Sequence, residues 1–225
     1  MKINHVCKEN NWIEPAEIKN VRTLILGSFN PFNPNGQNTD YYYGRQSNYF
    51  WKVIAMLLGK NENYFTDNLR NKLEVMKDYR FCFLDVIESI EISNAENDDL
   101  VNQKFANEHI YTNYFDAKLF TTTHGAANVK VNRNYNQKVF SVIENQDIQR
   151  VVHTMGNSTI TKQFKTKPKE KSLGMNGFEG YINAIKNTNV EFVPTSYSPS
   201  GYAVRRSGVA YLETLKAWIN SNLLS

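Results

Sequence analysis

Cysteine is scarce in this chain of 225 residues, which contains only Cys7 and Cys82. Two cysteines exclude a disulfide scaffold and a four-cysteine zinc or iron–sulfur site, and their spacing excludes a CxxC redox pair. Cys82 lies in the apolar run 81–84, which should bury it. So few thiols favour a reducing compartment.

Long apolar runs are also missing. The longest, at residues 53–58, is far shorter than the ~20 residues that span a bilayer. Residues 1–8 contain no apolar segment of the kind found in a secretion signal. We therefore expect a cytosolic protein without a membrane segment.

An excess of charge of one sign is nearly absent, because 26 Lys and Arg residues face 22 Asp and Glu residues, for a net charge of +4. This balance permits a polyanionic partner but does not indicate one. The densest basic stretch, residues 162–171, is typical of a solvated surface loop, and a loop that contacts phosphates is the alternative.

Metal-ligand patterns are missing as well. The chain has four histidines and no cluster of His, Cys and Asp at metal-binding spacing, so we expect no metal ion. His124 and His153 fall near the ends of predicted strands but are weak candidates for a site. Asn157, which follows another such strand, is explained as well by a turn.

Short apolar runs do occur, and they alternate with segments of helical spacing. We expect strands at residues 21–29, 81–87, 117–123, 150–155 and 190–195, and helices at 50–58 and 209–219, the second after a cap at Ser207. This alternation predicts one α/β domain over residues 1–225, a three-layer α/β/α fold with a central, mainly parallel sheet of four to five strands. Ligands of such sheets bind beyond the carboxyl ends of the strands.

The segment after the first strand is a long loop rich in turn-forming and aromatic residues. It runs from Gly27 past Asn30 to Tyr43 and reaches Asn48 at the start of the next helix. Long loops in compact domains are usually functional. Asn48 alone would be explained equally well as an ordinary helix cap.

Three segments resemble a known family. Gly27-Ser28 followed by Tyr42-Tyr43-x-x-x-x-Asn48-x-Phe50-Trp51 resembles the first motif of the hypoxanthine-DNA glycosylase branch of the uracil-DNA glycosylase superfamily, which reads G-S-x-P-G and then Y-Y-x-x-x-x-N-x-F-W. Residues 84–87 resemble its W-D-V-L segment, and residues 193–199 resemble its second motif, L-P-S-x-S-P. The resemblance covers roughly residues 21–90 and 190–220, with insertions expected within 95–189. Asn30-Pro31 stands where the family has Pro-Gly.

The resemblance implies a DNA glycosylase that flips a base out of the duplex and hydrolyses its N-glycosidic bond without a metal or another cofactor. It implies that Asn48 positions water or the base, with Asn30 as the competing candidate. Asp85 could orient water or stabilise the sugar cation, or could only cap a loop. Substrate contacts are expected from Gly27, Ser28, Phe29, Tyr43, Ser196 and Ser198. DNA contacts are expected from Ser200, Gly201, Tyr202, Arg205 and Arg206.

Several functions remain open. The deaminated bases hypoxanthine and uracil are the expected substrates in DNA repair by base excision, and a modified base of phage DNA, removed as antiviral defence, is the alternative. A serine hydrolase is disfavoured, because G-x-S-x-G is missing and Pro199, after Ser198, has no N–H for an oxyanion hole. A noncatalytic nucleic-acid-binding module would use the same basic and aromatic surface. We expect DNA as the partner of a monomer, with Tyr202 or Val204 as a wedge.

Overall fold

A four-stranded parallel sheet forms the centre of the computed structural model, which describes residues 2–9, 12, 18–33, 38–94, 123–124, 129–156 and 178–225. Its strand order is β3-β2-β7-β8. The strands are β2 (Thr23–Gly27), β3 (Phe81–Asp85), β7 (Arg150–His153) and β8 (Glu191–Phe192). Each lies inside a run predicted from the sequence, and the mixed α/β class with a parallel sheet is confirmed.

The central strand, β2, is buried along its whole length, as its continuous apolar sequence predicts. Gly27 pairs with Asp85 of β3, and Leu26 pairs with His153 of β7, so these three strands end level with one another. The segments that follow them therefore leave the sheet at the same carboxyl edge.

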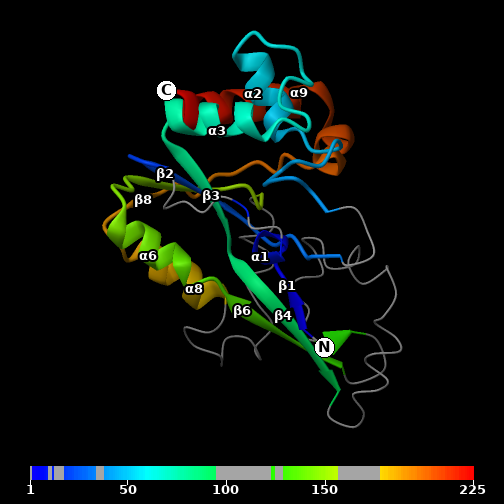
Figure 1. Ribbon diagram of the computed structural model, residues 1–225, viewed down its shortest axis with the longest axis vertical. Helices are drawn as coiled ribbons and strands as arrows, with labels where there is room; N and C mark the ends of the chain where they lie inside the picture. Colours follow the sequence, from blue (N-terminus) through cyan, green and yellow to red (C-terminus); the bar gives the residue numbers. More distant parts are fainter. Residues whose placement is uncertain are drawn as a thin grey trace.

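A second sheet was not predicted. It is antiparallel, with the order β1-β4-β6-β5, and comprises β1 (Lys2–Asn4), β4 (Ile87–Asn94), β6 (Val129–Tyr135) and β5 (Thr123–His124). Only Val86 separates β3 from β4, so the strand expected to continue to residue 87 ends at Asp85 and the chain changes sheets there. In Figure 1 this sheet extends away from the parallel sheet.

The strand expected at residues 117–123 is corrected in part. Residues 117–122 lie outside the described residues, and Thr123 belongs to β5, which pairs antiparallel with β6. The described end of this segment is therefore not a strand of the parallel sheet.

Helices lie on two sides of the parallel sheet in Figure 1. One group consists of α2 (Phe50–Leu57), α3 (Leu69–Asp78) and α9 (Gly201–Ile219), and the other of α6 (Lys138–Asn145) and α8 (Phe178–Lys186). The short α1 (Val6–Glu9) follows β1, and a π-helical segment (Asn220–Leu224) follows α9. Helix α2 confirms the prediction for residues 50–58.

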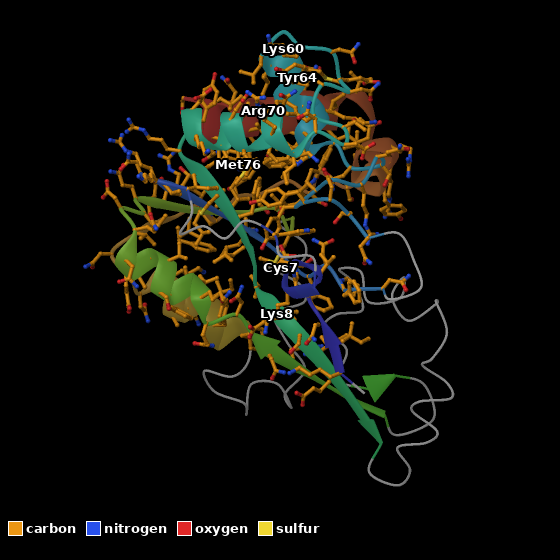
Figure 2. The ribbon with its side chains drawn as sticks, viewed as in Figure 1. Cys7, Lys8, Lys60, Tyr64, Arg70 and Met76 are labelled. Carbon is orange, nitrogen blue, oxygen red and sulfur yellow. The ribbon has the colours of Figure 1, made fainter. Side chains whose placement is uncertain are left out.

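Side chains from α2 and α3 fill the space above the sheet. Phe50, Val53 and Ile54 of α2 are fully buried. Met76 of α3 is buried toward the sheet, whereas Arg70 lies on the outer side of the same helix (Figure 2). None of the helices that the structure describes combines the length and apolar character needed to cross a bilayer.

The last helix begins earlier than predicted. Ser200, not Ser207, caps it, because the Ser200 hydroxyl accepts a hydrogen bond from the Ala203 N–H at 3.2 Å. Gly208, at φ 75°, interrupts the helix, and Val209 beside it is 77% exposed instead of buried. The first two turns of α9 therefore precede the helix expected from the sequence, which was predicted to start at residue 209.

A buried ion pair ties the long loop after β2 to α3. The ammonium of Lys72 is almost completely buried and pairs with Asp40 of the loop. It also lies 5.9 Å from the ring centroid of Trp51. Because a buried cation is costly without a partner, the loop should be held in place by this pair.

We predict that Asp40→Asn destabilises the protein by roughly 3 kcal/mol, because Lys72 would keep its charge in the interior without a carboxylate. The free energy of unfolding in urea measures this loss. As a control, Glu74→Gln breaks the exposed pair between Arg70 and Glu74 and should cost less than about 1 kcal/mol. Equal losses in the two variants would contradict the prediction.

Candidate active site

A pocket of about 490 Å³ opens at the carboxyl edge of the parallel sheet. It is lined by the segments that follow β2, β3 and β7 and by the start of α9. All of the predicted site residues except Ser196 and Arg206 line it. Its lining also includes residues that the sequence analysis did not assign to the site, namely Thr39, Arg45, Ser47, Thr154, Met155 and Pro199.

Two loops that are far apart in the sequence meet at this pocket. The backbone N–H of Tyr49 donates to the carbonyl of Pro199 at 2.7 Å. Gly201 lies so close to the carbonyl of Ser47 that a Cβ at Gly201 would collide with it. The start of α9 is therefore fixed against the loop that contains Asn48.

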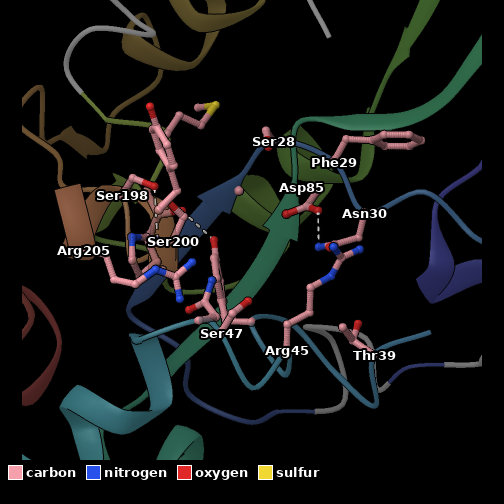
Figure 3. A pocket seen from close by; sticks show the side chains of 18 residues that line it. Ser28, Phe29, Asn30, Thr39, Arg45, Ser47, Asp85, Ser198, Ser200 and Arg205 are labelled. Atoms are coloured by element: carbon pink, nitrogen blue, oxygen red, sulfur yellow. Dashed lines mark hydrogen bonds between the residues drawn. The ribbon is translucent and has the colours of Figure 1, made fainter. Parts of the chain in front are cut away.

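Asp85 closes the inner end of the pocket. Its side chain is almost completely buried, and Oδ2 accepts hydrogen bonds from Asn30 Nδ2 at 3.1 Å and from His5 Nε2 at 2.6 Å. Gly27 makes this position possible, because a Cβ at Gly27 would collide with Asp85 Oδ1. Figure 3 shows Asp85 and Asn30 joined at one wall.

His5 is the residue of this group that the sequence analysis missed. It lies 80 positions before Asp85, between β1 and α1, and is nearly inaccessible to solvent. It does not itself line the large pocket, so it stands behind the carboxylate. No local pattern around His5 signals this pairing, which depends on how β1 pairs with β4.

Asn48 both makes a hydrogen bond at the start of α2 and lines the pocket. Its Oδ1 accepts the backbone N–H of Phe50 at 2.9 Å, as a residue at the start of a helix commonly does. Asn48 also lines the pocket, where its amide can donate hydrogen bonds to a ligand. Asn30 differs, because its amide already donates to Asp85.

The two aromatic residues expected to contact the substrate, Tyr43 and Phe29, occupy different positions. The ring of Tyr43 stacks on Phe50 with centroids 4.8 Å apart, and the Tyr43 hydroxyl lies 2.6 Å from Thr154 Oγ1, which fixes it at the pocket wall. The ring of Phe29 points away from the other labelled side chains in Figure 3 and packs against His5. Phe29 therefore fills the core and does not present its ring to a ligand.

The mouth of the pocket is polar and partly cationic. Arg205 and Arg45 come from opposite sides of the pocket in Figure 3. Tyr202, on the first turn of α9, is 68% exposed, and Arg206 Nη1 donates to its hydroxyl at 3.2 Å. Val204 is buried against the core, so it cannot serve as a wedge.

The remaining sequence candidates lie elsewhere. Ser196 is buried and does not line the pocket. His124 belongs to β5 of the antiparallel sheet. Asn157 and residues 162–171 lie outside the described residues. Within the described ranges, no three His, Cys, Asp or Glu side chains gather to form a metal site.

His153 is a buried core residue. Its Nε2 lies 3.3 Å from the carbonyl of Pro194, and its ring stacks on Phe192. Burial lowers the pKa of His153 to about 4, opposed by the hydrogen bond to Pro194 and assisted by the positive charge of Lys186. The imidazole is therefore neutral at pH 7, and it does not line the pocket.

Comparison with known proteins identified no relative: no family model, no curated protein and no solved structure matches this chain.

We predict that stability falls as the pH is lowered from about 6.5 toward 4. Over this range the unfolded state binds a proton at His153 and the folded state does not, because the folded pKa is about 4. A single such group contributes a slope of about 1.4 kcal/mol per pH unit. In His153→Phe this contribution should disappear from urea unfolding measured between pH 4 and 7. An unchanged slope would show that His153 takes up a proton in the folded protein.

Proposed function

We propose that this protein is a monofunctional DNA glycosylase that hydrolyses the N-glycosidic bond of a flipped-out deaminated base, hypoxanthine or uracil. The observation that carries the proposal is the meeting of the family-like segments at one pocket. The loop ending at Asn48, the strand end at Asp85 and the segment from Ser198 into the first turn of α9 are far apart in the sequence, yet all line it. A set of chance matches would not be expected to converge in this way.

The pocket has the groups that such a reaction needs. Hydrolysis passes through an oxocarbenium-like sugar, which a nearby carboxylate stabilises, and a water molecule must be held for attack. We assign the first role to Asp85 and the second to Asn48, both of which line the pocket. Tyr43, fixed by Thr154, provides a rigid ring beside the base.

The mouth of the pocket suits a phosphate backbone. The N-terminus of α9, capped by Ser200, presents backbone N–H groups and the positive end of the helix dipole. Arg205 adds a cation at the same place, and the exposed ring of Tyr202 can enter the gap left by a flipped base. This combination favours DNA over a small neutral substrate.

The finer features of the fold belong to the same proposal. We infer that the two groups of helices and the parallel sheet form the three-layer α/β/α core of a uracil-DNA glycosylase-like domain spanning residues 1–225. We further propose that the protein acts on DNA in the cytosol as a monomer and uses no cofactor. The alternative function, removal of a modified base from phage DNA, would use the same pocket to bind a modified base in place of hypoxanthine or uracil.

Two other functions predict different chemistry. In a serine hydrolase Ser198 would need a histidine beside it, but His5, which bonds Asp85, does not line the pocket. A noncatalytic nucleic-acid-binding module would have no use for a buried carboxylate that faces the cavity. The pocket therefore favours the glycosylase over both.

Asn48→Ala should lower the rate of base release at least ~100-fold, which is the usual effect of removing one positioned hydrogen-bonding group. The assay incubates the protein with duplexes that contain hypoxanthine, uracil or a modified cytosine and then cleaves abasic sites with alkali. Asn48→Asp keeps the oxygen that accepts the Phe50 N–H but loses the amide donor, so it should be similarly impaired in a folded protein.

The matched control for this assay is Asn145→Ala on α6, which removes an exposed amide that does not line the pocket. Full activity in Asn48→Ala would refute the role of Asn48. DNA binding without release of any base would identify a noncatalytic module, and strand cleavage before alkali treatment would contradict a monofunctional enzyme.

Arg205→Gln should weaken DNA binding about equally for all sequences and lower the slope of log K against log salt by about 1, as expected for the loss of one phosphate contact. Fluorescence anisotropy at several salt concentrations measures the slope. Arg70→Gln, an exposed change on α3 outside the pocket, should leave it unaltered. If both variants kept the parent's slope, Arg205 would not contact phosphate.

A further inference from the structure

The two oxygens of Asp85 have different environments. Oδ2 accepts the hydrogen bonds from His5 and Asn30, at 2.6 and 3.1 Å. Oδ1 lies against Gly27 and accepts no hydrogen bond from the described part of the chain. The carboxylate is thus anchored through one oxygen, and the other remains available to the pocket that Asp85 lines.

His5 is itself held in place from several sides. Its backbone N–H donates to the carbonyl of Glu88 at 2.9 Å, and the backbone N–H of Cys7 donates to its Nδ1 at 3.1 Å. The ring contacts Trp12 and Phe29 through edge-to-face packing. Since Nδ1 accepts a hydrogen bond from the Cys7 N–H, Nε2 is the protonated nitrogen that donates a hydrogen bond to Asp85.

Two opposing effects set the pKa of His5. Burial disfavours the charged imidazolium, but the carboxylate of Asp85 outweighs it and raises the pKa of His5 to about 9. The Nε2 proton is present in both protonation states of the ring, whereas a second proton on Nδ1 would displace the Cys7 N–H. In either state His5 donates to Asp85 and opposes protonation of the carboxylate.

We propose that His5 is a positioning residue that keeps Asp85 ionised and turns Oδ1 toward the reacting sugar. The role in catalysis rests on the proposed glycosylase function, whereas the arrangement of the charges does not. An almost fully buried carboxylate without a donor or cation beside it would favour its neutral form. A neutral Asp85 could neither stabilise a sugar cation nor accept a proton from water.

Other ionisable groups border a second, smaller cavity beside this pair. This cavity of about 10 Å³, roughly the space for one water molecule, is bordered by both His5 and Asp85. Its other ionisable neighbours are Cys7, Lys8, Tyr42, Glu88 and Lys138. Lys8 forms an ion pair with Glu88, so the effects of these two charges on Asp85 largely cancel. His5 is the ionisable residue around this cavity that contacts Asp85 directly.

The proposal can be tested without DNA. In protein labelled with 13C, the carboxyl carbon of Asp85 reports its titration, and 15N shifts report the Nε2 proton of His5. His5→Phe removes the donor and the cation, and we expect Asp85 to titrate at least about one pH unit higher than in the parent. His5→Gln keeps a donor but cannot become a cation, so its shift should be smaller and in the same direction.

His153→Phe is the matched control, because it replaces another buried histidine that does not contact Asp85. It should leave the titration of Asp85 unchanged. If His5→Phe does not fold, His5→Gln gives the result. A titration of Asp85 that is unaltered in the folded His5 variants overturns the proposal, whatever the outcome of any glycosylase assay.

Base release provides the second readout. In His5→Phe the acidic limb of the rate profile should move to higher pH, so that kcat at a pH on that limb falls ~10-fold for each unit of movement and recovers as the pH is raised. KM for DNA should stay the same, since His5 lies outside the pocket. A loss of rate equal at every pH would mean that His5 has a structural role only. A shifted titration in a protein whose parent releases no base would reject the proposed function alone.

Discussion

A carboxylate held almost entirely out of water is the constraint on which the rest of the site depends. Asp85 can occupy the carboxyl edge of the parallel sheet because its neighbour on β2, Gly27, has no side chain. There, His5 and Asn30 hydrogen-bond to one of its two oxygens, so that the carboxyl group is not buried without partners. The N-terminal segment, the end of β2 and the end of β3 are therefore coupled through a single side chain.

The pocket above this carboxylate is enclosed by a second set of contacts. The hydrogen bond from Tyr49 to Pro199 and the close approach of Gly201 to Ser47 hold the start of α9 against the loop that precedes α2. That loop is in turn tied to α3 through Lys72. These contacts enclose a cavity whose lining groups can be set before any ligand arrives, which is the condition for strong electrostatic effects on a bound group.

Sequence reasoning succeeded where local pattern and position in a sheet agree. The apolar run of β2 predicted a buried strand, and the rule that ligands bind beyond strand ends directed attention to Asn30, Asp85 and Asn48, all of which line the pocket. It failed where a single residue altered a regular pattern. Gly208 breaks the helical spacing of α9, and the spacing by itself gave no sign that Ser200 would cap the helix.

By itself the sequence determined the α/β class and four of the strands, because these depend on apolar periodicity. Most of the predicted residues that line the pocket came from the resemblance of three segments to a known family. Only the tertiary structure decided the partner of Asp85. His5 is 80 positions away from Asp85 in the sequence. The pairing of β1 with β4 in the second sheet brings it there, and the apolar periodicity of the sequence did not predict this sheet. The orientation of Phe29 was likewise decided by packing, since its ring is buried against that same histidine.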